Sequence, residues 1–242
     1  MTQQKDVIIQ LFEKKRDALD LLGKAWEILY FEGNSPDVGK RRENFIIEML
    51  REEFGLNVEQ APDTEKEIDF KIQIGNRWKK YSLKTMELKP RETKRGKRYD
   101  YSNVKMAWDG FPDKKNAVKK ILTFNFDYDL LLVIGNREEH TISMAIIRSS
   151  DLKKIQAECK TDPDKVDKYW WIPNANTNPR GFGLRGKTIK ALLENAKSRG
   201  DFITYTYKPL PKDKIEKLKR QYFKDWYALI KKIASSAKST DE

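Results

Sequence analysis

Residues 68–85 form two alternating segments joined by a short turn. The first segment alternates apolar and polar side chains, with Ile68, Phe70, Ile72 and Ile74 apolar and Asp69, Lys71 and Gln73 polar. After the turn, Tyr81, Leu83 and Thr85 fall on one side of the second segment, and Lys80, Ser82 and Lys84 fall on the other. A period of two residues is typical of a half-buried strand. The pattern therefore predicts an antiparallel β-hairpin with one buried face and one polar face.

The turn between the two segments determines how the strands pair. Residues 75–76 are Gly-Asn, a favoured two-residue hairpin loop, and with this loop at the tip Asp69 lies opposite Ser82. If the tip slips by one residue on each side, Asp69 faces Lys84, and a three-residue loop places it opposite Leu83. Both two-residue registers leave an acid, a hydroxyl and a lysine on one surface. The alternative is that these residues form only the solvent-exposed face of an ordinary amphipathic sheet, which has the same pattern.

The segment before the hairpin carries an acid in an unusual place. Residues 39–55 are predicted to form a helix that Gly55 ends, with an apolar stripe of Ile46, Ile47, Leu50 and Phe54. Glu43 falls on that stripe, and burying a carboxylate is costly unless it is paired or bound to a metal. An alternative is that Glu43, in the first helical turn, reaches solvent or favours the helix dipole.

The order of predicted elements around the hairpin resembles a known nuclease core. A strand over 56–61 and a polar turn at 62–64 precede the hairpin, and a helix over 113–123 and a strand over 128–134 follow it. With Glu43 facing inward, Asp69 heading a strand and Lys84 after the hairpin, residues 39–135 resemble the PD-(D/E)xK nuclease superfamily. That superfamily includes many type II restriction endonucleases and the archaeal Holliday-junction resolvases. The resemblance implies an α/β fold with a central mixed sheet flanked by helices, with further helices at both ends of this chain.

The resemblance also implies roles for individual residues. Asp69 would be the metal-bridging carboxylate, Lys84 the motif lysine and Glu43 the helix acid found in many members. The backbone carbonyl of Leu83 would be a further ligand of Mg²⁺. Mg²⁺ held there would polarise the scissile phosphate and activate water, while Lys84 would orient that water or stabilise the transition state.

Ser82 departs from the superfamily motif. It stands where the superfamily usually has Glu or Asp, and a hydroxyl is a poor ligand for a hard divalent cation. Some restriction enzymes of the superfamily carry Ser-x-Lys and take a carboxylate from elsewhere. We expect Glu43 to be the substitute, with Glu87 as the second choice.

Two rival motif positions are less favoured than Asp69. Asp63 follows a proline, as in the literal motif, but it lies in a turn-forming run where Asp is common for local reasons. Glu87 begins a literal Glu-x-Lys, but it lies on the opposite side of a regular strand from Lys84, and Pro90 is expected to end that strand at once. A β-bulge would be needed to bring Glu87 into the site.

The overall charge agrees with a polyanionic partner. The chain has 49 Lys plus Arg against 37 Asp plus Glu, a net charge of +12, which is typical of nucleic-acid binding although a membrane surface would also attract it. The excess is concentrated in residues 77–105. We expect a phosphate-gripping loop there, with DNA contacts from Arg91, Lys94, Arg95, Lys97 and Arg98. A solvated charged loop is the alternative.

A second candidate recognition segment covers residues 169–187. Its amide and guanidinium groups suit base edges, and the predicted DNA contacts are Asn176, Asn178, Arg180 and Arg185. The alternative is an ordinary Asn-Pro-Gly loop anchored by Trp170 and Trp171.

Rare residue types exclude several kinds of chemistry. The chain has one histidine, His140, and one cysteine, Cys159, which excludes zinc fingers, Cys-His nucleophile pairs and His-rich nuclease motifs. No disulfide can form within the chain, so we expect a cytoplasmic protein. No apolar run exceeds five residues and no signal-like segment starts the chain, so no membrane association is expected.

The whole chain is predicted to be one elaborated nuclease domain. Its parts are an N-terminal helical segment (1–36), a catalytic core (37–150), a DNA-recognition region (151–210) and a C-terminal helix (211–242). Ser149 or Ser150 is the expected cap of the helix that follows the core. The C-terminal helix has an apolar seam of Ile215, Leu218, Tyr222, Trp226, Leu229 and Ile233, which packs either on the core or on a second subunit.

Together these features predict a Mg²⁺-dependent type II restriction endonuclease. It would cut double-stranded DNA at a specific sequence, leave 5′-phosphate ends and act as a homodimer, since a symmetric site suits a two-fold protein. A Holliday-junction resolvase or a repair nuclease of the same superfamily is the alternative with the same chemistry. An inactive, nuclease-derived DNA-binding protein is the alternative that Ser82 leaves open.

Overall fold

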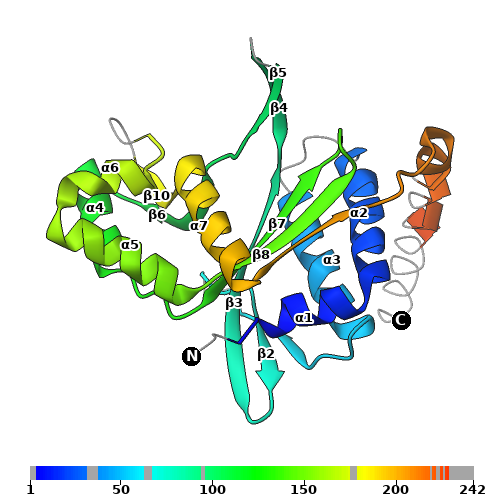
Figure 1. Cartoon of the computed structure of the whole chain (residues 1–242), viewed down its shortest axis with the longest axis horizontal. Helices are drawn as coiled ribbons and strands as arrows, with labels where there is room; N and C mark the ends of the chain where they lie inside the picture. The colour runs from blue at the N-terminus through cyan, green and yellow to red at the C-terminus, as the bar shows by residue number, and fades with distance from the viewer. Residues whose placement is uncertain are drawn as a thin grey trace, which may run out of the picture.

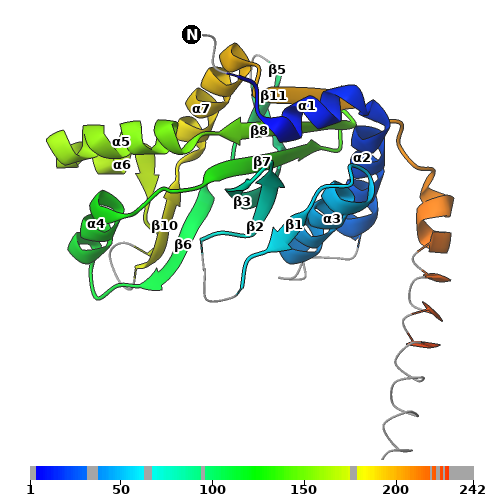
Figure 2. The same cartoon turned by 90° about the horizontal axis from the view of Figure 1, so that it is seen from below.

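The protein has three layers, with a central sheet between two groups of helices (Figures 1 and 2). The computed structural model describes residues 4–31, 38–62, 67–93, 96–174, 179–218, 220–221, 224–225 and 227–228. One face of the sheet packs on α1 (Val7–Lys14), α2 (Arg16–Phe31) and α3 (Val38–Glu52). The other packs on α4 (Lys114–Thr123), α5 (Ser149–Thr161) and α7 (Gly186–Arg199), and the short α6 (Val166–Tyr169) follows a 3-10 turn at Pro163–Lys165.

The central sheet has six strands in the order β1-β2-β3-β7-β8-β11. Their bounds are β1 (Val58–Gln60), β2 (Phe70–Ile74), β3 (Arg77–Glu87), β7 (Asp129–Asn136), β8 (Thr141–Ile147) and β11 (Phe202–Thr206). Strands β3 and β7 are parallel and the other neighbours are antiparallel, so the predicted mixed sheet with flanking helices is confirmed. The predicted helix over 113–123 and the predicted strand over 128–134 correspond to α4 and β7.

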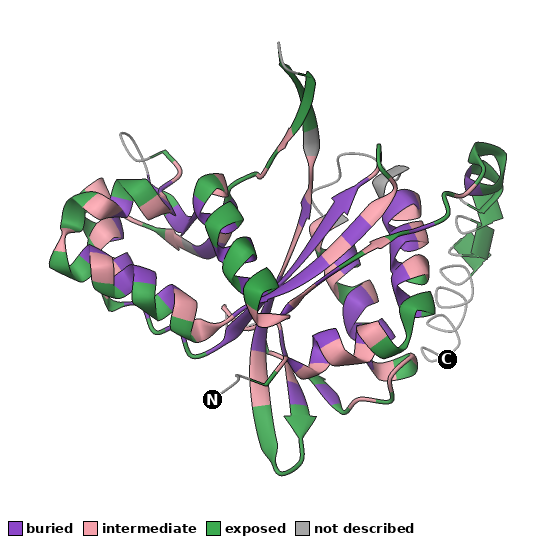
Figure 3. Cartoon of the chain, in the orientation of Figure 1, coloured by how far each residue is buried: buried purple, intermediate pink, exposed green. Residues whose placement is uncertain are grey.

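Two smaller sheets extend this core. A three-stranded sheet joins β6 (Val104–Gly110), β10 (Arg180–Leu184) and β9 (Trp170–Trp171) on the α4–α7 side. A two-stranded ribbon of β4 (Lys89–Thr93) and β5 (Gly96–Asp100) projects from the end of β3, away from the β2–β3 hairpin at its other end (Figure 1). The β4–β5 ribbon and the tip of the β2–β3 hairpin are largely exposed, whereas the middle of the central sheet is buried (Figure 3).

The β2–β3 hairpin has the first of the registers considered above. Ile74 pairs with Arg77, and Gly75 has φ +58°, which glycine adopts without strain. The Asp69 amide donates a hydrogen bond to the carbonyl of Tyr81 (3.0 Å), so Asp69 lies beside Ser82 across the hairpin. The slipped register and the three-residue loop are therefore excluded.

Helix α3 ends as its sequence predicts. Its last apolar positions lie in the core, and Gly55 reverses the chain with φ +62°. The amides of Gly55 and Leu56 donate to the carbonyls of Arg51 (2.9 Å) and Leu50 (3.2 Å), which would otherwise lack partners at the helix end. This end leads the chain directly into β1.

Three local predictions differ from the structure. The basic segment expected to be a loop is the β4–β5 ribbon, and Pro90 lies inside β4, which is possible because the ribbon has only two strands and both are edges. The cap of α5 is Arg148, because the chain is already helical at Ser149, whose amide donates to Asp129 (2.8 Å). The C-terminal segment is helical from 212 to 218, where Ile215 of the predicted seam is buried and Leu218 is 41% exposed. Tyr222, Trp226, Leu229 and Ile233 lie outside the described residues.

Candidate active site

Asp69 is the centre of a small polar cluster on the sheet. It immediately precedes β2, and three donors from β3 point to its Oδ2 atom: the Ser82 hydroxyl (3.1 Å), the Leu83 amide (2.6 Å) and the Lys84 ammonium (3.0 Å). Ser82 is fully buried, whereas Asp69 and Lys84 are each about one-fifth exposed. Within the part of the chain that the structure describes, Oδ1 of Asp69 has no partner. The donors therefore orient the carboxylate and leave one oxygen available.

Lys84 is held between two acceptors. Its ammonium donates to Asp69 Oδ2 and to the backbone carbonyl of Leu83 (3.1 Å). An ammonium has three donors, so one N–H remains for an anion or a water molecule. The alternating hairpin pattern placed Asp69, Ser82 and Lys84 on one surface, and the structure brings them together there.

Glu43 reaches the same cluster from α3. Burial and the nearby Asp69 carboxylate raise the pKa of Glu43 to about 7, although Lys84 and Lys40 act in the opposite direction. Among the described residues no hydrogen bond or ion pair reaches the Glu43 carboxylate. The Glu43 side chain is half-buried beside a second acid.

The oxygen atoms of this cluster fit a hard divalent cation. The free Oδ1 of Asp69, the unpaired carboxylate of Glu43 and the carbonyl of Leu83 are the donor types that Mg²⁺ prefers. The described residues contain no group of three or more His, Cys, Asp or Glu side chains suited to a metal. A metal at this site would therefore depend on two carboxylates, a backbone carbonyl, water and substrate, a set that Mg²⁺ tolerates.

Sequence reasoning overlooked two residues beside Asp69. Burial raises the pKa of the Tyr128 hydroxyl well above its usual range, and the carboxylates of Glu67 and Asp69 raise it further. Tyr128 is buried, and its hydroxyl has no hydrogen-bond partner in the described part of the chain. The sequence signal for Glu67 is its place two positions before Asp69. Tyr128 lies two positions before Leu130, the parallel partner of Ser82, and this pairing is not visible in the sequence.

The rival acid Glu87 does not join this cluster. Glu87 lies at the end of β3 and accepts hydrogen bonds from Trp26 (2.5 Å) and Arg137 (2.8 Å), so both of its oxygens are engaged elsewhere. It is therefore not the substitute carboxylate in this conformation. Asp63 lies outside the described residues.

The predicted DNA contacts fall into separate groups. Arg91, Arg98 and Arg185 line one groove between the β4–β5 ribbon and α7. Lys97 instead forms an ion pair with Glu138, and Arg180 lies at the opposite end of β10 from Arg185. The remaining predicted contacts, Lys94, Arg95, Asn176 and Asn178, lie outside the described residues.

The rare residues take structural positions. His140 lies in the β7–β8 turn, where Nδ1 is 3.2 Å from a carboxylate oxygen of Glu27. Cys159 is buried in the core on α5. In the described part of the chain, no helix combines the length and the apolar character needed to cross a membrane.

Comparison with known proteins identifies the fold. No protein-family model matches the sequence, and no curated protein matches it either. Among solved structures, the chain is similar to a restriction endonuclease in complex with substrate DNA. The TM-score is 0.54 at 23% sequence identity, and the match covers 85% of this chain and 88% of the other. The chain therefore has a restriction endonuclease-like fold.

Proposed function

We propose that this protein is a Mg²⁺-dependent endonuclease that hydrolyses phosphodiester bonds of double-stranded DNA. The observation that carries the proposal is the grouping of Asp69, Lys84 and Glu43 on a restriction endonuclease-like fold. The similar solved structure is a restriction endonuclease with substrate DNA, and the net charge of +12 suits the same partner. Within this class we favour a cytoplasmic type II restriction enzyme that cuts at a specific sequence and leaves 5′-phosphate ends.

Each residue of the site has a proposed task. Lys84 would donate its remaining N–H to the attacking water or to a non-bridging phosphate oxygen, where charge increases in the transition state. Ser82 and the Leu83 amide would keep Asp69 oriented, so that little reorganisation is needed during the reaction. Removing one such stabilising group typically lowers the rate roughly a hundredfold or more.

Asp69, Glu43 and the Leu83 carbonyl would hold Mg²⁺. Bound there, Mg²⁺ would polarise the phosphate and lower the pKa of a water molecule. It would also relieve the repulsion between Asp69 and Glu43 that raises the pKa of Glu43. In this proposal Glu43 replaces the carboxylate that Ser82 does not provide.

An inactive DNA-binding protein is the second candidate. Ser82 is fully buried and the described residues provide only two side-chain carboxylates for the cation, which is the observation that favours it. Such a protein would keep the fold and the positive charge and would bind DNA without cutting it.

Incubation of supercoiled plasmid with the protein and Mg²⁺ tests the proposal. We expect the wild-type chain to cut, and the variants Asp69→Ala and Lys84→Ala to be at least a hundredfold slower. Lys80→Ala is the matched control, because Lys80 is also a β3 lysine but forms an ion pair with Asp127 (2.9 Å). Absence of cleavage of both the plasmid and four-way junctions by the wild-type chain would refute the nuclease, and binding without cleavage would select the inactive protein.

The pattern of products identifies the kind of nuclease. Discrete fragments from a linear DNA would support a sequence-specific restriction enzyme, and cutting confined to four-way junctions would select the resolvase. We also expect a homodimer, because a protein with two-fold symmetry can cut both strands of a symmetric site. Light scattering or sedimentation would measure its mass directly.

A further inference from the structure

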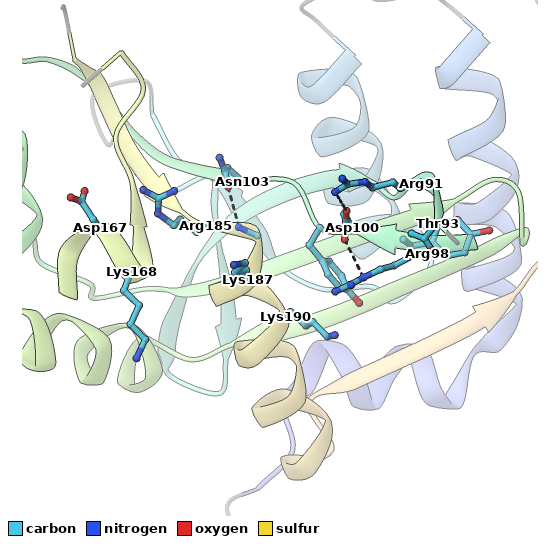
Figure 4. Close-up of a pocket in the computed structure, with 13 residues that line it drawn as sticks. Arg91, Thr93, Arg98, Asp100, Asn103, Asp167, Lys168, Arg185, Lys187 and Lys190 are labelled. Carbon is cyan, nitrogen blue, oxygen red and sulfur yellow. Dashed lines mark hydrogen bonds and ion pairs between the residues drawn. The ribbon is translucent and has the colours of Figure 1, made fainter. Parts of the chain in front are cut away.

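A groove of about 1050 Å³ lies between the β4–β5 ribbon and the first turn of α7 (Figure 4). We call it the basic groove. Its cationic side chains are Arg91, Arg98, Lys168, Arg185, Lys187 and Lys190. They come from β4, β5, α6 and the start of α7, and none of the candidate active-site residues lines the groove.

The positive charges of the basic groove are poorly balanced. Asp100 is shared between two guanidinium groups, Arg91 (3.6 Å) and Arg98 (3.5 Å). The other acid of the lining, Asp167, forms an ion pair with Lys114 outside the groove (2.6 Å). The four remaining cations, Lys168, Arg185, Lys187 and Lys190, have no ion-pair partner in the described part of the chain.

The wall formed by α7 is held firmly in place. The Gly186 amide donates to Asn103 (3.0 Å), and a Cβ atom at Gly186 would lie 1.9 Å from the carbonyl of Tyr101, so only glycine allows this close approach. The Thr188 hydroxyl also donates to the carbonyl of Tyr169 (2.9 Å). Arg185 makes no side-chain capping bond, so the positive end of the α7 dipole adds to the lysine charges.

We propose that the basic groove binds the phosphate backbone of a DNA duplex beside the cleavage site. The inference rests on the proposed function, because it assigns a second contact to the same duplex. Lysines and a helix N-terminus bind phosphates without reading sequence. The amide oxygen of Asn103 already accepts from Gly186, so this side chain is engaged within the protein and not with a base.

The distance to the candidate active site suits one duplex. Lys84 and Arg91 lie on the consecutive strands β3 and β4, with Arg91 seven positions later in the chain. At about 3.3 Å per residue they are separated by at most roughly 23 Å along the chain. One turn of B-DNA spans about 34 Å, so a duplex cut near Lys84 reaches the groove within one turn.

The test measures binding of a short duplex of mixed sequence at increasing salt. Ca²⁺ replaces Mg²⁺ in these experiments so that cleavage is suppressed, and fluorescence anisotropy gives the dissociation constant. Lys187 and Lys190 are exposed, so the double variant Lys187→Gln with Lys190→Gln removes two charges without disturbing the core. Each phosphate contact contributes about 0.9 to the slope of log K against log salt, so this variant should lower the slope by about 1.8.

The matched control removes two charges elsewhere. Lys115 and Lys119 are exposed on α4, outside the groove, and Lys115→Gln with Lys119→Gln should leave the slope unchanged. If the wild-type chain cuts DNA but the groove variant and this control have equal slopes, DNA binding by the basic groove would be refuted and the nuclease would stand. A wild-type chain that fails to cut, while the groove variant still lowers the slope, would refute the nuclease and support the groove.

Discussion

Two acidic clusters of this protein differ in how their charges are matched. The first is the candidate active site, where Glu43 and Asp69 share one lysine, Lys84. The second joins the N-terminal segment to the sheet and contains Asp6, Asp129 and Asp201 with the cations Lys79, Arg148 and Arg199. We call the second cluster the paired network.

In the paired network every carboxylate has a cation close by. Lys79 lies 2.5 Å from Asp6 and 2.8 Å from Asp129, and Arg148 lies 2.7 Å from Asp201. Burial alone would raise the pKa of Asp201, but Arg148, the Asp6 amide and Arg199 lower it overall. The opposite holds for Glu43, whose pKa rises to about 7.

The charges of the paired network are arranged to stabilise the fold, whereas those of the candidate active site suit catalysis. Carboxylates in ion pairs need no further ligand, whereas Glu43, which lies beside Asp69 and has no ion pair in the described part of the chain, leaves negative charge for a cation to neutralise. In the candidate active site the Asp69 charge therefore acts against ionisation of Glu43, whereas in the paired network the cations favour ionisation of Asp201. Substitutions in the two clusters should have opposite consequences for activity and stability.

The largest expected effect comes from neutralising one aspartate in each cluster. Asp69→Asn should lower DNA cleavage by roughly a hundredfold or more while the protein stays folded, because it removes a proposed metal ligand from a partly exposed site. Asp201→Asn should instead reduce the free energy of unfolding by about 3 kcal/mol, because Arg148 loses its buried partner, whereas Arg199 keeps its ion pair with Asp151.

Cleavage rates and urea unfolding curves of both variants provide the measurement. Rates must be compared without urea and at a temperature at which Asp201→Asn is still folded, as circular dichroism can verify. If Asp69→Asn retained full activity, or if it destabilised the protein as strongly as Asp201→Asn, the distinction between the two clusters would be wrong.

The next effect concerns the two lysines of β3 that belong to different clusters. Lys84→Gln should slow cleavage by about a hundredfold, since the proposed transition-state donor is lost. Lys79→Gln should mainly destabilise the fold, because it leaves Asp6 and Asp129 without their cation. Equal rates for Lys84→Gln and the wild-type chain at saturating Mg²⁺ would remove Lys84 from the mechanism.

Sequence alone predicted the parts of the candidate site that depend on local patterns. The two-residue period and the Gly-Asn turn sufficed to place Asp69, Ser82 and Lys84 on one surface, and the helical period predicted that Glu43 faces inward. These patterns depend on residues that are near each other in the chain. The mixed sheet with flanking helices followed from the resemblance and is confirmed by the structure, whereas its strand order was not predicted.

Other features depend on contacts between distant segments. The place of Tyr128 beside Asp69 depends on the parallel pairing of β3 with β7, which no local pattern encodes. The basic groove forms only because α7 packs against the segment 101–103, and the paired network brings Asp6 to Asp201 across the fold. The basic segment was predicted as a loop because its alternation of charges carries no apolar face.

The third prediction uses the raised pKa of Glu43. The pKa of Glu43 rises from an ordinary 4.5 to about 7 in the folded protein, so the folded state holds this proton more tightly than the unfolded state. In the metal-free protein, stability is therefore lost as the pH rises from about 4.5 to 7 and stays low above that. Glu43→Gln should be neutral near pH 4 and should stabilise the protein at pH 8 by up to about 3 kcal/mol.

Urea unfolding of the wild-type chain and Glu43→Gln at both pH values, with a chelator present, measures this effect. Adding Mg²⁺ at pH 8 should stabilise the wild-type chain and have a much smaller effect on the variant, because one proposed ligand is missing. If the stability difference between the wild-type chain and Glu43→Gln did not change with pH, the Asp69 charge would not act on an ionised Glu43 in the folded protein.

The smallest expected effect tests Ser82, which departs from the motif of the superfamily that the sequence resembles. Ser82→Ala removes one of three hydrogen bonds to Asp69 Oδ2, and the amide of Leu83 and the ammonium of Lys84 remain. A hydrogen bond of this kind contributes about 1 kcal/mol, so we expect a rate only several-fold lower and a similarly small loss of stability. Ser82→Asp should be worse than Ser82→Ala, because position 82 is fully buried and a third carboxylate there would face Asp69 without a new cation. If Ser82→Asp instead increased cleavage at saturating Mg²⁺, the site would be able to use the carboxylate that the superfamily normally has there, and the proposed substitution by Glu43 would be unnecessary.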